Sequence, residues 1–369
     1  MSGGPARVLV LSASIGEGHD LPARILADEI VRREPAAVVA IADFLAIVSP
    51  LLRRIVIGGS QFHSELGNRM FDIEFRLASE VRFTRRLGQW GLWVLGHRRL
   101  GRAIARFAPD VVVSTYPGAT ELLGAMRERG RLAVPAVSAI TDLAALRYWA
   151  CPGVDLHLIT HPESRAEVAA IAPRSRIEAA RGLNDPSFYS PRDPFEARRE
   201  LDLPAAGPIV LVSGGGWGVG DARGATETAL GIPGVYVVCL CGRNDDLRAD
   251  MQRTYRGNPR VRVLGFSDRM RDLLSASDVL VHSTAGLTVL EAIICGTRVI
   301  SYGWGRAHIR ANNRAYREFG LAEVVDDPSG LRAALERALA APGEPDRSFA
   351  ELPEAAELVL GETRASIAR

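Results

Sequence analysis

The sequence predicts an α/β protein with two doubly wound, Rossmann-like domains of parallel strands. The chain has 369 residues, 47% of them apolar, which is enough for two ordinary cores. Short apolar runs alternate with helix-like spacing in two separate series, as in parallel sheets covered on both faces. A proline-rich break between the two series indicates a boundary between two domains.

The first series of elements occupies the N-terminal half. Residues 8–11 form a short apolar run, and a glycine-containing loop at residues 12–19 follows it. Apolar residues at helix spacing come next, so this segment predicts a strand, a loop and a helix in succession. The further strands predicted in this half are residues 38–41, 111–114, 137–140 and 156–159.

The second series begins after the break, which reads GLNDPSFYSPRDP at residues 182–194. Its predicted strands are residues 209–212, 235–240, 261–264, 279–282 and 298–302, and one more helix follows from Ser329. We therefore expect an N-terminal domain at residues 1–185 and a C-terminal domain at residues 195–345. The tail, residues 346–369, is expected to return to the first domain.

Composition and charge exclude several classes of protein. The formal net charge is only +2, whereas a nucleic-acid binder needs a clear basic excess, so we expect no nucleic-acid partner. All 45 basic residues are arginine, which excludes Schiff-base lysines and lysine-containing phosphate loops. We interpret the four cysteines as reduced core residues. The first apolar run is too short for a signal segment, so we expect a cytoplasmic protein that can still touch a membrane.

A glycine-rich loop follows the first predicted strand of the second series. It reads SGGGWGVG from Ser213, and residues such as Gly214, Gly215 and Gly216 let backbone amides approach an anion closely. The alternative is that these glycines only form a tight turn. Arg243 lies just after the next strand, where it could neutralise a phosphate or be an ordinary surface arginine.

A strand, a small-residue turn and a helix start follow one another in DVLVHSTAGLTVLE, residues 278–291. Free amides and the helix dipole favour a diphosphate at Gly286, Leu287 and Thr288. Glu291 could accept hydrogen bonds from ribose hydroxyls, or it could merely stabilise the dipole. His282 could bind a phosphate, or it could be a buried strand-end histidine whose hydrogen bonds are satisfied.

Other loops supply candidates for a pocket that binds the nucleobase and for a general base. Phe266 and Met270 lie near the end of a predicted strand, where an aromatic base ring can bind. In the N-terminal half, the loop with Gly16 and His19 follows the first strand, and Asp142 follows residues 137–140. We expect these loops to open toward the nucleotide, with Gly16 among the residues that bind the donor. His19 and Asp142 are both placed to deprotonate an acceptor hydroxyl, although either could instead cap backbone amides.

These loops resemble those of the monogalactosyldiacylglycerol synthases, the bacterial diacylglycerol glucosyltransferases and the N-acetylglucosaminyltransferase of lipid II synthesis. The resemblance covers residues 8–325. The motifs that carry it are SIGEGH ending at His19, PDVVVSTYP from Pro109, ITDL ending at Leu143 with Trp149 after it, SGGGWGVG, VCLCGRND, VRVLGFSDRM and SDVLVHSTAGLTVLEA.

The resemblance implies the GT-B fold, in which two such domains face each other across a cleft. It also implies a metal-independent, anomer-inverting transfer from a UDP-sugar to a lipid hydroxyl, with no separate cofactor. The N-terminal domain would bind the acceptor, and His19 or Asp142 would be its base. The C-terminal domain would bind the donor: Gly286, Leu287 and Thr288 the diphosphate, Glu291 the ribose, Phe266 and Met270 the uracil, and the segment from His308 through Asn312 to Asn313 the sugar.

The sequence departs from that family at several contact positions. Ser283 stands where the glycolipid enzymes usually carry a lysine or arginine, and HSTAG is similar to a motif of natural-product glycosyltransferases. His308 replaces a glutamine or glutamate of the sugar-contact loop. Leu146 replaces a histidine, and Glu17 replaces a glycine. The departures leave the sugar, the nucleotide (UDP or TDP) and the acceptor open.

The segment at residues 81–108 bears on whether the acceptor is a lipid or a small soluble molecule. It contains seven arginines and no acidic residue, with Trp90, Trp93 and several aliphatic residues between them. Such a helix could lie on an anionic membrane and bring a lipid acceptor to the enzyme. The alternative is a packed helix with a solvated arginine face, as in an enzyme for small soluble aglycones. A non-catalytic nucleotide-sugar-binding protein and a UDP-sugar 2-epimerase are further alternatives.

Overall fold

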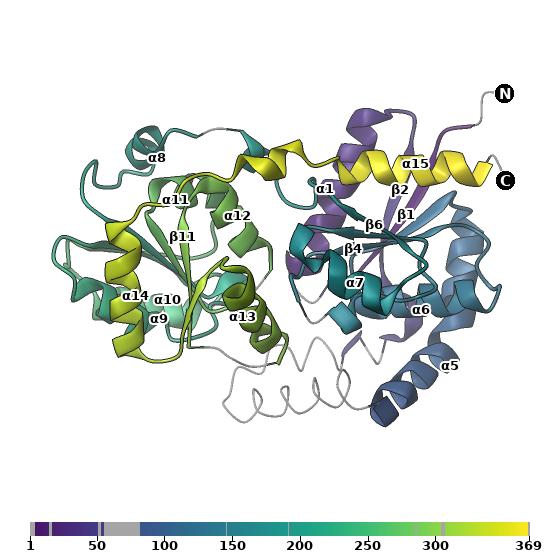
Figure 1. Cartoon of the computed structure of the whole chain (residues 1–369), viewed down its shortest axis with the longest axis horizontal. Helices are drawn as coiled ribbons and strands as arrows, with labels where there is room; N and C mark the ends of the chain where they lie inside the picture. The colour runs from purple at the N-terminus through teal and green to yellow at the C-terminus, as the bar shows by residue number, and fades with distance from the viewer. Residues whose placement is uncertain are drawn as a thin grey trace. The chain divides into compact units, whose positions relative to one another are not determined.

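The computed structural model describes residues 4–14, 17–50, 53–54, 82–144, 146–190, 192–284, 286–303 and 307–367. The chain divides into two compact units, which Figure 1 shows as two sheets with their helices. Unit 1 contains residues 1–185 and 351–369, and unit 2 contains residues 186–350. The predicted α/β fold with two doubly wound parallel sheets is confirmed.

Unit 1 has a six-stranded parallel sheet in the order β2-β1-β3-β4-β5-β6. Its strands are β1 (Arg7–Ser12), β2 (Val38–Asp43), β3 (Val111–Ser114), β4 (Ala136–Ile140), β5 (Leu156–Ile159) and β6 (Arg176–Ala179). Its helices are α1 (Glu17–Arg33), α2 (Phe44–Val48), α5 (Arg82–Phe107), α6 (Pro117–Glu128), α7 (Arg165–Ile171) and α15 (Ala355–Ile367). Short 3-10 turns are η1 (Leu146–Tyr148) and η2 (Pro162–Ser164).

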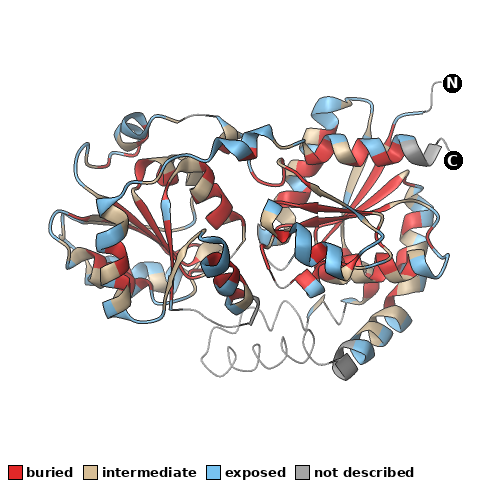
Figure 2. Cartoon of the chain, in the orientation of Figure 1, coloured by how far each residue is buried: buried red, intermediate tan, exposed pale blue. Residues whose placement is uncertain are grey.

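The core of unit 1 lies on both faces of this sheet because successive strand residues point to opposite sides. Val8 and Val10 belong to the apolar cluster beneath α1 and α15. Leu9 and Leu11 belong to the cluster beneath α2, α5 and α6. The strands are accordingly buried in Figure 2, while β2 at the edge of the sheet is half-exposed.

Unit 2 repeats the design with the order β12-β11-β10-β7-β8-β9. Its strands are β7 (Ile209–Ser213), β8 (Tyr236–Leu240), β9 (Val261–Leu264), β10 (Val279–His282), β11 (Arg298–Tyr302) and β12 (Glu323–Val325). Its α-helices are α8 (Pro194–Glu200), α9 (Ala222–Leu230), α10 (Asp245–Thr254), α11 (Met270–Ala276), α12 (Leu287–Cys295), α13 (Ala307–Phe319) and α14 (Pro328–Ala340). Its 3-10 turns are η3 (Pro186–Tyr189) and η4 (Gly215–Trp217), and η5 (Arg347–Glu351) runs from this unit into unit 1.

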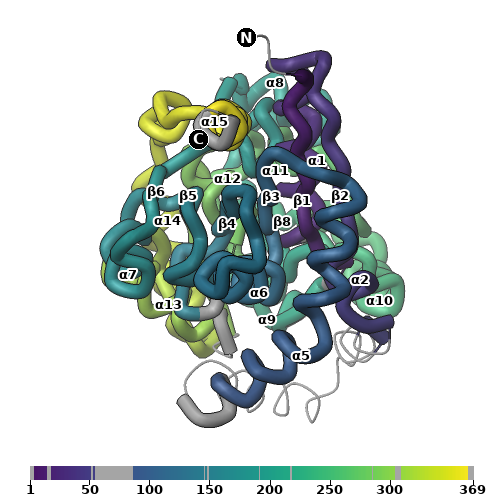
Figure 3. Tube along the Cα trace, turned by 90° about the vertical axis from the view of Figure 1, so that its right-hand side faces the viewer, coloured from purple at the N-terminus to yellow at the C-terminus, as the bar shows by residue number. Residues whose placement is uncertain are grey.

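The C-terminal helix α15 belongs to unit 1, where it runs beside α1 (Figures 1 and 3). The backbone of Arg181 forms a parallel bridge with Glu354 at the start of this segment. The Glu354 carboxylate accepts from Arg33 Nε at 2.5 Å and from an Arg181 guanidinium nitrogen at 2.7 Å. The hydrogen bond from Arg33 and the two guanidinium charges hold the pKa of Glu354 below its usual value. The pairs fix the end of the chain to α1 and to the segment after β6.

We predict that Glu354→Gln lowers the free energy of unfolding by about 1 kcal/mol at pH 7, because the ion pairs are partly solvated. The folded-state pKa of Glu354 is depressed, so its stabilisation is present above the unfolded pKa and is lost as the pH falls through the folded pKa. Denaturant unfolding should therefore show a smaller deficit at pH 3 than at pH 7. Glu357→Gln, on a more exposed carboxylate in the first turn of α15, is the matched control. An equal deficit at both pH values would contradict the assignment.

Candidate functional site

In each sheet, the chain reverses its direction of winding beside the first strand. In unit 2 the chain runs from β7 to β8 and β9 on one side, and then to β10, β11 and β12 on the other. Such a reversal opens a crevice at the carboxyl ends of the two central strands. The predicted glycines 214–216 follow β7, and the predicted diphosphate residues 286–288 follow β10, so both groups lie at this crevice.

The glycines of the first loop serve different purposes. A Cβ on Gly214 would lie 2.1 Å from the Val219 carbonyl oxygen, so this position must be glycine for the turn to close. Gly215 has a φ of +69°, which also favours glycine. The nearest atom to a Cβ on Gly216 would be an Arg243 guanidinium nitrogen at 3.8 Å. Gly216 is therefore the glycine whose open side faces a cation.

Arg243 joins the glycine loop to the predicted base pocket. Its backbone N–H donates to the Gly216 carbonyl at 2.8 Å, which ties the loop after β8 to the loop after β7. Its guanidinium lies over the Phe266 ring, 3.9 Å from the ring centroid. Phe266 is 51% exposed, and Met270 begins α11 just after it. The structure thus brings together the residues predicted for the phosphate and for the base.

His282 is buried at the end of β10, with protein groups on both ring nitrogens. Nδ1 lies 3.0 Å from the Ser213 carbonyl, which can only accept, so Nδ1 carries the proton. Nε2 then accepts from the Thr284 hydroxyl at 2.6 Å. Burial lowers the pKa of His282 to about 4, so the ring is neutral at pH 7. This geometry favours the alternative interpretation, in which His282 orients Thr284 and does not bind a phosphate itself.

The helix α12 begins directly at the crevice. Gly286 precedes it with a φ of +95°, and Leu287 and Thr288 are its first residues. The first N–H groups of a helix have no carbonyl partner within it and can bind an anion. Glu291 lies in the next turn and is only 6% exposed.

The other residues predicted to bind the sugar donor lie in α13 or outside the described part of the chain. Asn312 is buried in α13, and the neighbouring Asn313 accepts from the Ser301 hydroxyl of β11 at 2.7 Å. The side chain of His308 and the whole of Gly16 lie outside the described residues.

In unit 1, His19 lies in the first turn of α1, at the reversal between β1 and β3. Its Nδ1 is 2.9 Å from the Thr115 carbonyl, so Nδ1 donates and Nε2 has the lone pair in the neutral ring. The ring contacts the edge of Tyr116, with centroids 5.2 Å apart, and lies 5.5 Å from the Trp149 ring. A neutral imidazole held in this tautomer can act as a general base through Nε2.

The second predicted base, Asp142, lies beside the same tryptophan. Its carboxylate accepts from the Trp149 indole N–H at 2.9 Å. Trp149 thus contacts both His19 and Asp142. The sequence analysis named Trp149 only as part of a family motif and gave it no role, and it did not single out Tyr116, which lies in the PDVVVSTYP segment.

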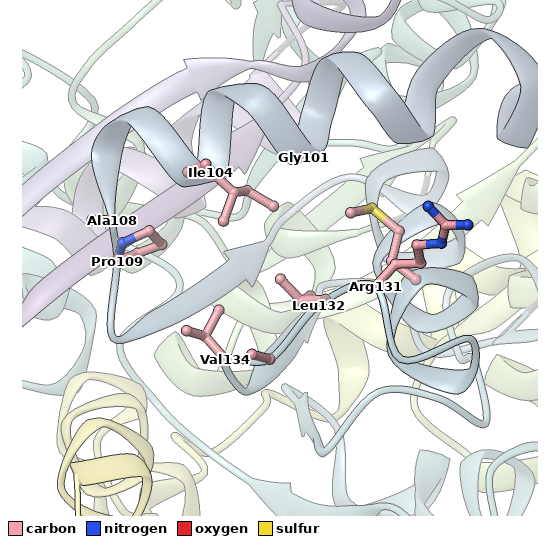
Figure 4. Close-up of a pocket in the computed structure, with 10 residues that line it drawn as sticks. Gly101, Ile104, Ala108, Pro109, Arg131, Leu132 and Val134 are labelled. Carbon is pink, nitrogen blue, oxygen red and sulfur yellow. The ribbon is translucent and has the colours of Figure 1, made fainter.

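One cavity of unit 1 lies apart from the predicted site residues. A cavity of about 370 Å³ opens between α5 and α6, lined by residues such as Gly101, Ile104 and Leu132 (Figure 4). It lies at the N-terminal ends of β3 and β4, opposite the carboxyl edge, and holds none of the predicted residues. Among the described residues, no cluster of three or more His, Cys, Asp or Glu side chains is placed to hold a metal ion.

Comparison with known proteins gives matches in both halves. Residues 19–179 match the family model of monogalactosyldiacylglycerol synthase, and residues 233–341 match that of glycosyl transferases group 1. The chain is 22% identical over 336 residues to a processive diacylglycerol beta-glucosyltransferase of Bacillus thuringiensis, covering 90% of this chain and 85% of that protein. It is 21% identical over 323 residues to the Bacillus subtilis enzyme of the same name, covering 87% and 83%.

Solved structures show the same architecture. The glycosyltransferase SnogD from Streptomyces nogalater aligns with a TM-score of 0.57 at 17% identity, covering 98% of this chain and 100% of that one. MurG of Acinetobacter baumannii aligns with a TM-score of 0.57 at 15% identity, covering 98% and 95%. The chain is therefore a glycosyltransferase with the GT-B fold, and its sequence resembles the monogalactosyldiacylglycerol synthases and the bacterial diacylglycerol glucosyltransferases.

Proposed function

We propose that the enzyme transfers a hexose from a UDP-sugar to the hydroxyl of a diacylglycerol-like lipid, with inversion and without a metal ion. The single observation that carries the acceptor is the match over about nine-tenths of the chain to diacylglycerol glucosyltransferases. The UDP-sugar is supported by a structural relative from Medicago truncatula that was solved with UDP-glucose, at 11% identity and a TM-score of 0.57, covering 98% of this chain and 94% of that one.

The reaction that fits these residues is a single displacement. His19 Nε2 takes the proton of the acceptor hydroxyl, and the oxygen attacks the anomeric carbon. The bond from that carbon to the diphosphate oxygen breaks, and UDP leaves with the electron pair. Because attack comes from the face opposite the leaving group, the anomeric configuration inverts. The imidazolium that remains on His19 then releases its proton.

The leaving diphosphate needs positive charge, and Arg243 with the start of α12 supplies it in this proposal. Ser283, which stands where related enzymes carry a basic residue, packs closely against the backbone. A Cβ on Gly220 would lie 2.2 Å from the Ser283 hydroxyl oxygen. A small side chain suits this contact. Among the described residues that the sequence singled out, the cation nearest the glycine loop is then Arg243.

The lipid acceptor is supported by the exposed face of α5. Leu87, Trp90 and Val94 lie three and four residues apart on one face, and their exposed fractions are 56%, 63% and 50%. Arg86, Arg98 and Arg102 are also exposed on this helix, which has no acidic residue. Among the described residues, no helix is long and apolar enough to span a bilayer. We therefore propose that α5 lies on an anionic membrane surface.

A second candidate is transfer to a small soluble aglycone. The similarity of HSTAG to a motif of natural-product glycosyltransferases favours it. The two candidates differ in whether the enzyme must bind a lipid surface.

We predict that Glu291→Gln weakens UDP binding at least tenfold in calorimetric titration, because a charged acceptor for ribose hydroxyls is lost. Wild type should bind UDP more tightly than 2′-deoxy- or 3′-deoxy-UDP, and the variant should lose this preference. Thermal unfolding of both proteins controls for the fold. If the variant still discriminates against both deoxy nucleotides, Glu291 does not bind the ribose.

We predict that Trp90→Gln with Val94→Gln reduces binding to vesicles of phosphatidylglycerol and phosphatidylcholine at least tenfold, because two apolar side chains no longer enter the interface. Binding of wild type should weaken as the salt concentration rises. The matched control is Val31→Gln with Val38→Gln, which changes two similarly exposed side chains of α1 and β2. Sedimentation of the vesicles measures the effect. Wild type that stays in the supernatant at low salt while glycosylating a soluble aglycone would favour the second candidate.

A further inference from the structure

Trp149 is a buried side chain that contacts both predicted bases of unit 1. It follows η1 in the loop after β4, and it is 2% exposed. Its backbone N–H donates to the Leu146 carbonyl at 2.9 Å, which closes the short turn. The Ser138 hydroxyl donates to its carbonyl at 3.3 Å, which ties the turn to β4. The backbone therefore holds the indole at a fixed place on the carboxyl edge of the sheet.

The imidazole of His19 lies between two aromatic side chains. Tyr116 meets it nearly perpendicularly, with an interplanar angle of 83°, and Trp149 meets it at 47°. The Thr115 carbonyl accepts from Nδ1. A half-turn of the ring would break that hydrogen bond, and the neighbouring rings resist it sterically. The position of Trp149 therefore helps to decide which nitrogen faces the acceptor.

Asp142 is connected to His19 through the indole of Trp149. Its Oδ2 accepts from Trp149 Nε1 at 2.9 Å, which is a normal length for a hydrogen bond to a carboxylate. This bond fixes the rotation of the indole about its side-chain bonds. Asp20, the charged residue that follows His19 in the sequence, accepts instead from the Ser12 hydroxyl.

We propose that Trp149 is a positioning residue for His19 and that Asp142 acts by anchoring the indole rather than by taking the acceptor proton. This rests on the proposed function, in which His19 is the base. It assigns different roles to the two side chains that the sequence left as alternatives. What the site requires at position 142 is then a hydrogen-bond acceptor for the indole, and the negative charge is secondary.

Conservative and disruptive substitutions at positions 142 and 149 should differ in their effect on kcat. An asparagine at position 142 can still accept from the indole through its amide oxygen, so Asp142→Asn should keep kcat within about threefold of wild type. Asp142→Leu and Trp149→Phe both remove the hydrogen bond and should lower kcat at least tenfold, because a small displacement of the base is costly. The KM for the UDP-sugar should not change, since neither substituted side chain is one assigned to the donor.

The decisive measurement is the tautomer of His19 in the free enzyme, read from ¹⁵N chemical shifts of its ring above the pH at which it titrates. Wild type and Asp142→Asn should show the proton on Nδ1. Trp149→Phe and Asp142→Leu should show a mixture of tautomers or exchange broadening. Trp93→Phe, which changes a tryptophan of α5 that stacks on His97, is the matched control and should resemble wild type.

The outcomes distinguish this proposal from the proposed function. Asp142→Asn that is as inactive as His19→Ala would overturn the proposal, because Asp142 would then be needed for its charge or as the base. An unchanged His19 tautomer in Trp149→Phe would overturn it as well. If the tautomers change as expected but wild type transfers no sugar to a lipid, the positioning role stands and the acceptor assignment fails.

Discussion

The reversal of winding beside the first strand of each sheet is the constraint on which the rest of the structure depends. Parallel strands place all their carboxyl ends at one edge, and the reversal separates the loops of two neighbouring strands there. In unit 2 this constraint places the glycine loop after β7 beside the start of α12. In unit 1 it places His19, at the start of α1, beside the loop after β3. The places of the candidate site residues follow from the topology before any side-chain detail is considered.

The sequence predicted all the buried central strands and also β2 and β9, which are half-exposed strands at the sheet edges. Central strands such as β3 and β10 are continuous apolar runs, because helices cover both of their faces. The sequence analysis missed β6 and β12, which lie at the sheet edges. Both are short and half-exposed, with charged residues such as Arg176, Glu178 and Glu323 within them. In β6 and β12 the charged residues leave no apolar run longer than two residues, so the pattern is too weak to predict a strand.

The candidate site shows a similar division. The loops and their order were predictable because they follow buried strands. The partners of individual side chains were not predictable, because they come from distant segments of the chain. Trp149 lies between two residues that the sequence did single out, and Arg243 stacks on Phe266 from the neighbouring strand. His282 illustrates this limit, since the sequence left open whether it binds a phosphate or is a buried histidine with satisfied hydrogen bonds, and the structure places Ser213 and Thr284 at its two nitrogens.

We assign the donor to the glycine-lined crevice of unit 2 beside Arg243, and the base to the imidazole of His19 in unit 1. The central claim is an inverting transfer to a lipid hydroxyl. The most direct test is to incubate the enzyme with UDP-α-glucose or UDP-α-galactose and diacylglycerol in mixed micelles, with a metal chelator present, and to determine the anomeric configuration of the lipid product by NMR. The account predicts a β-linked glycolipid. An α-linked product, or no lipid product with either donor, would contradict it.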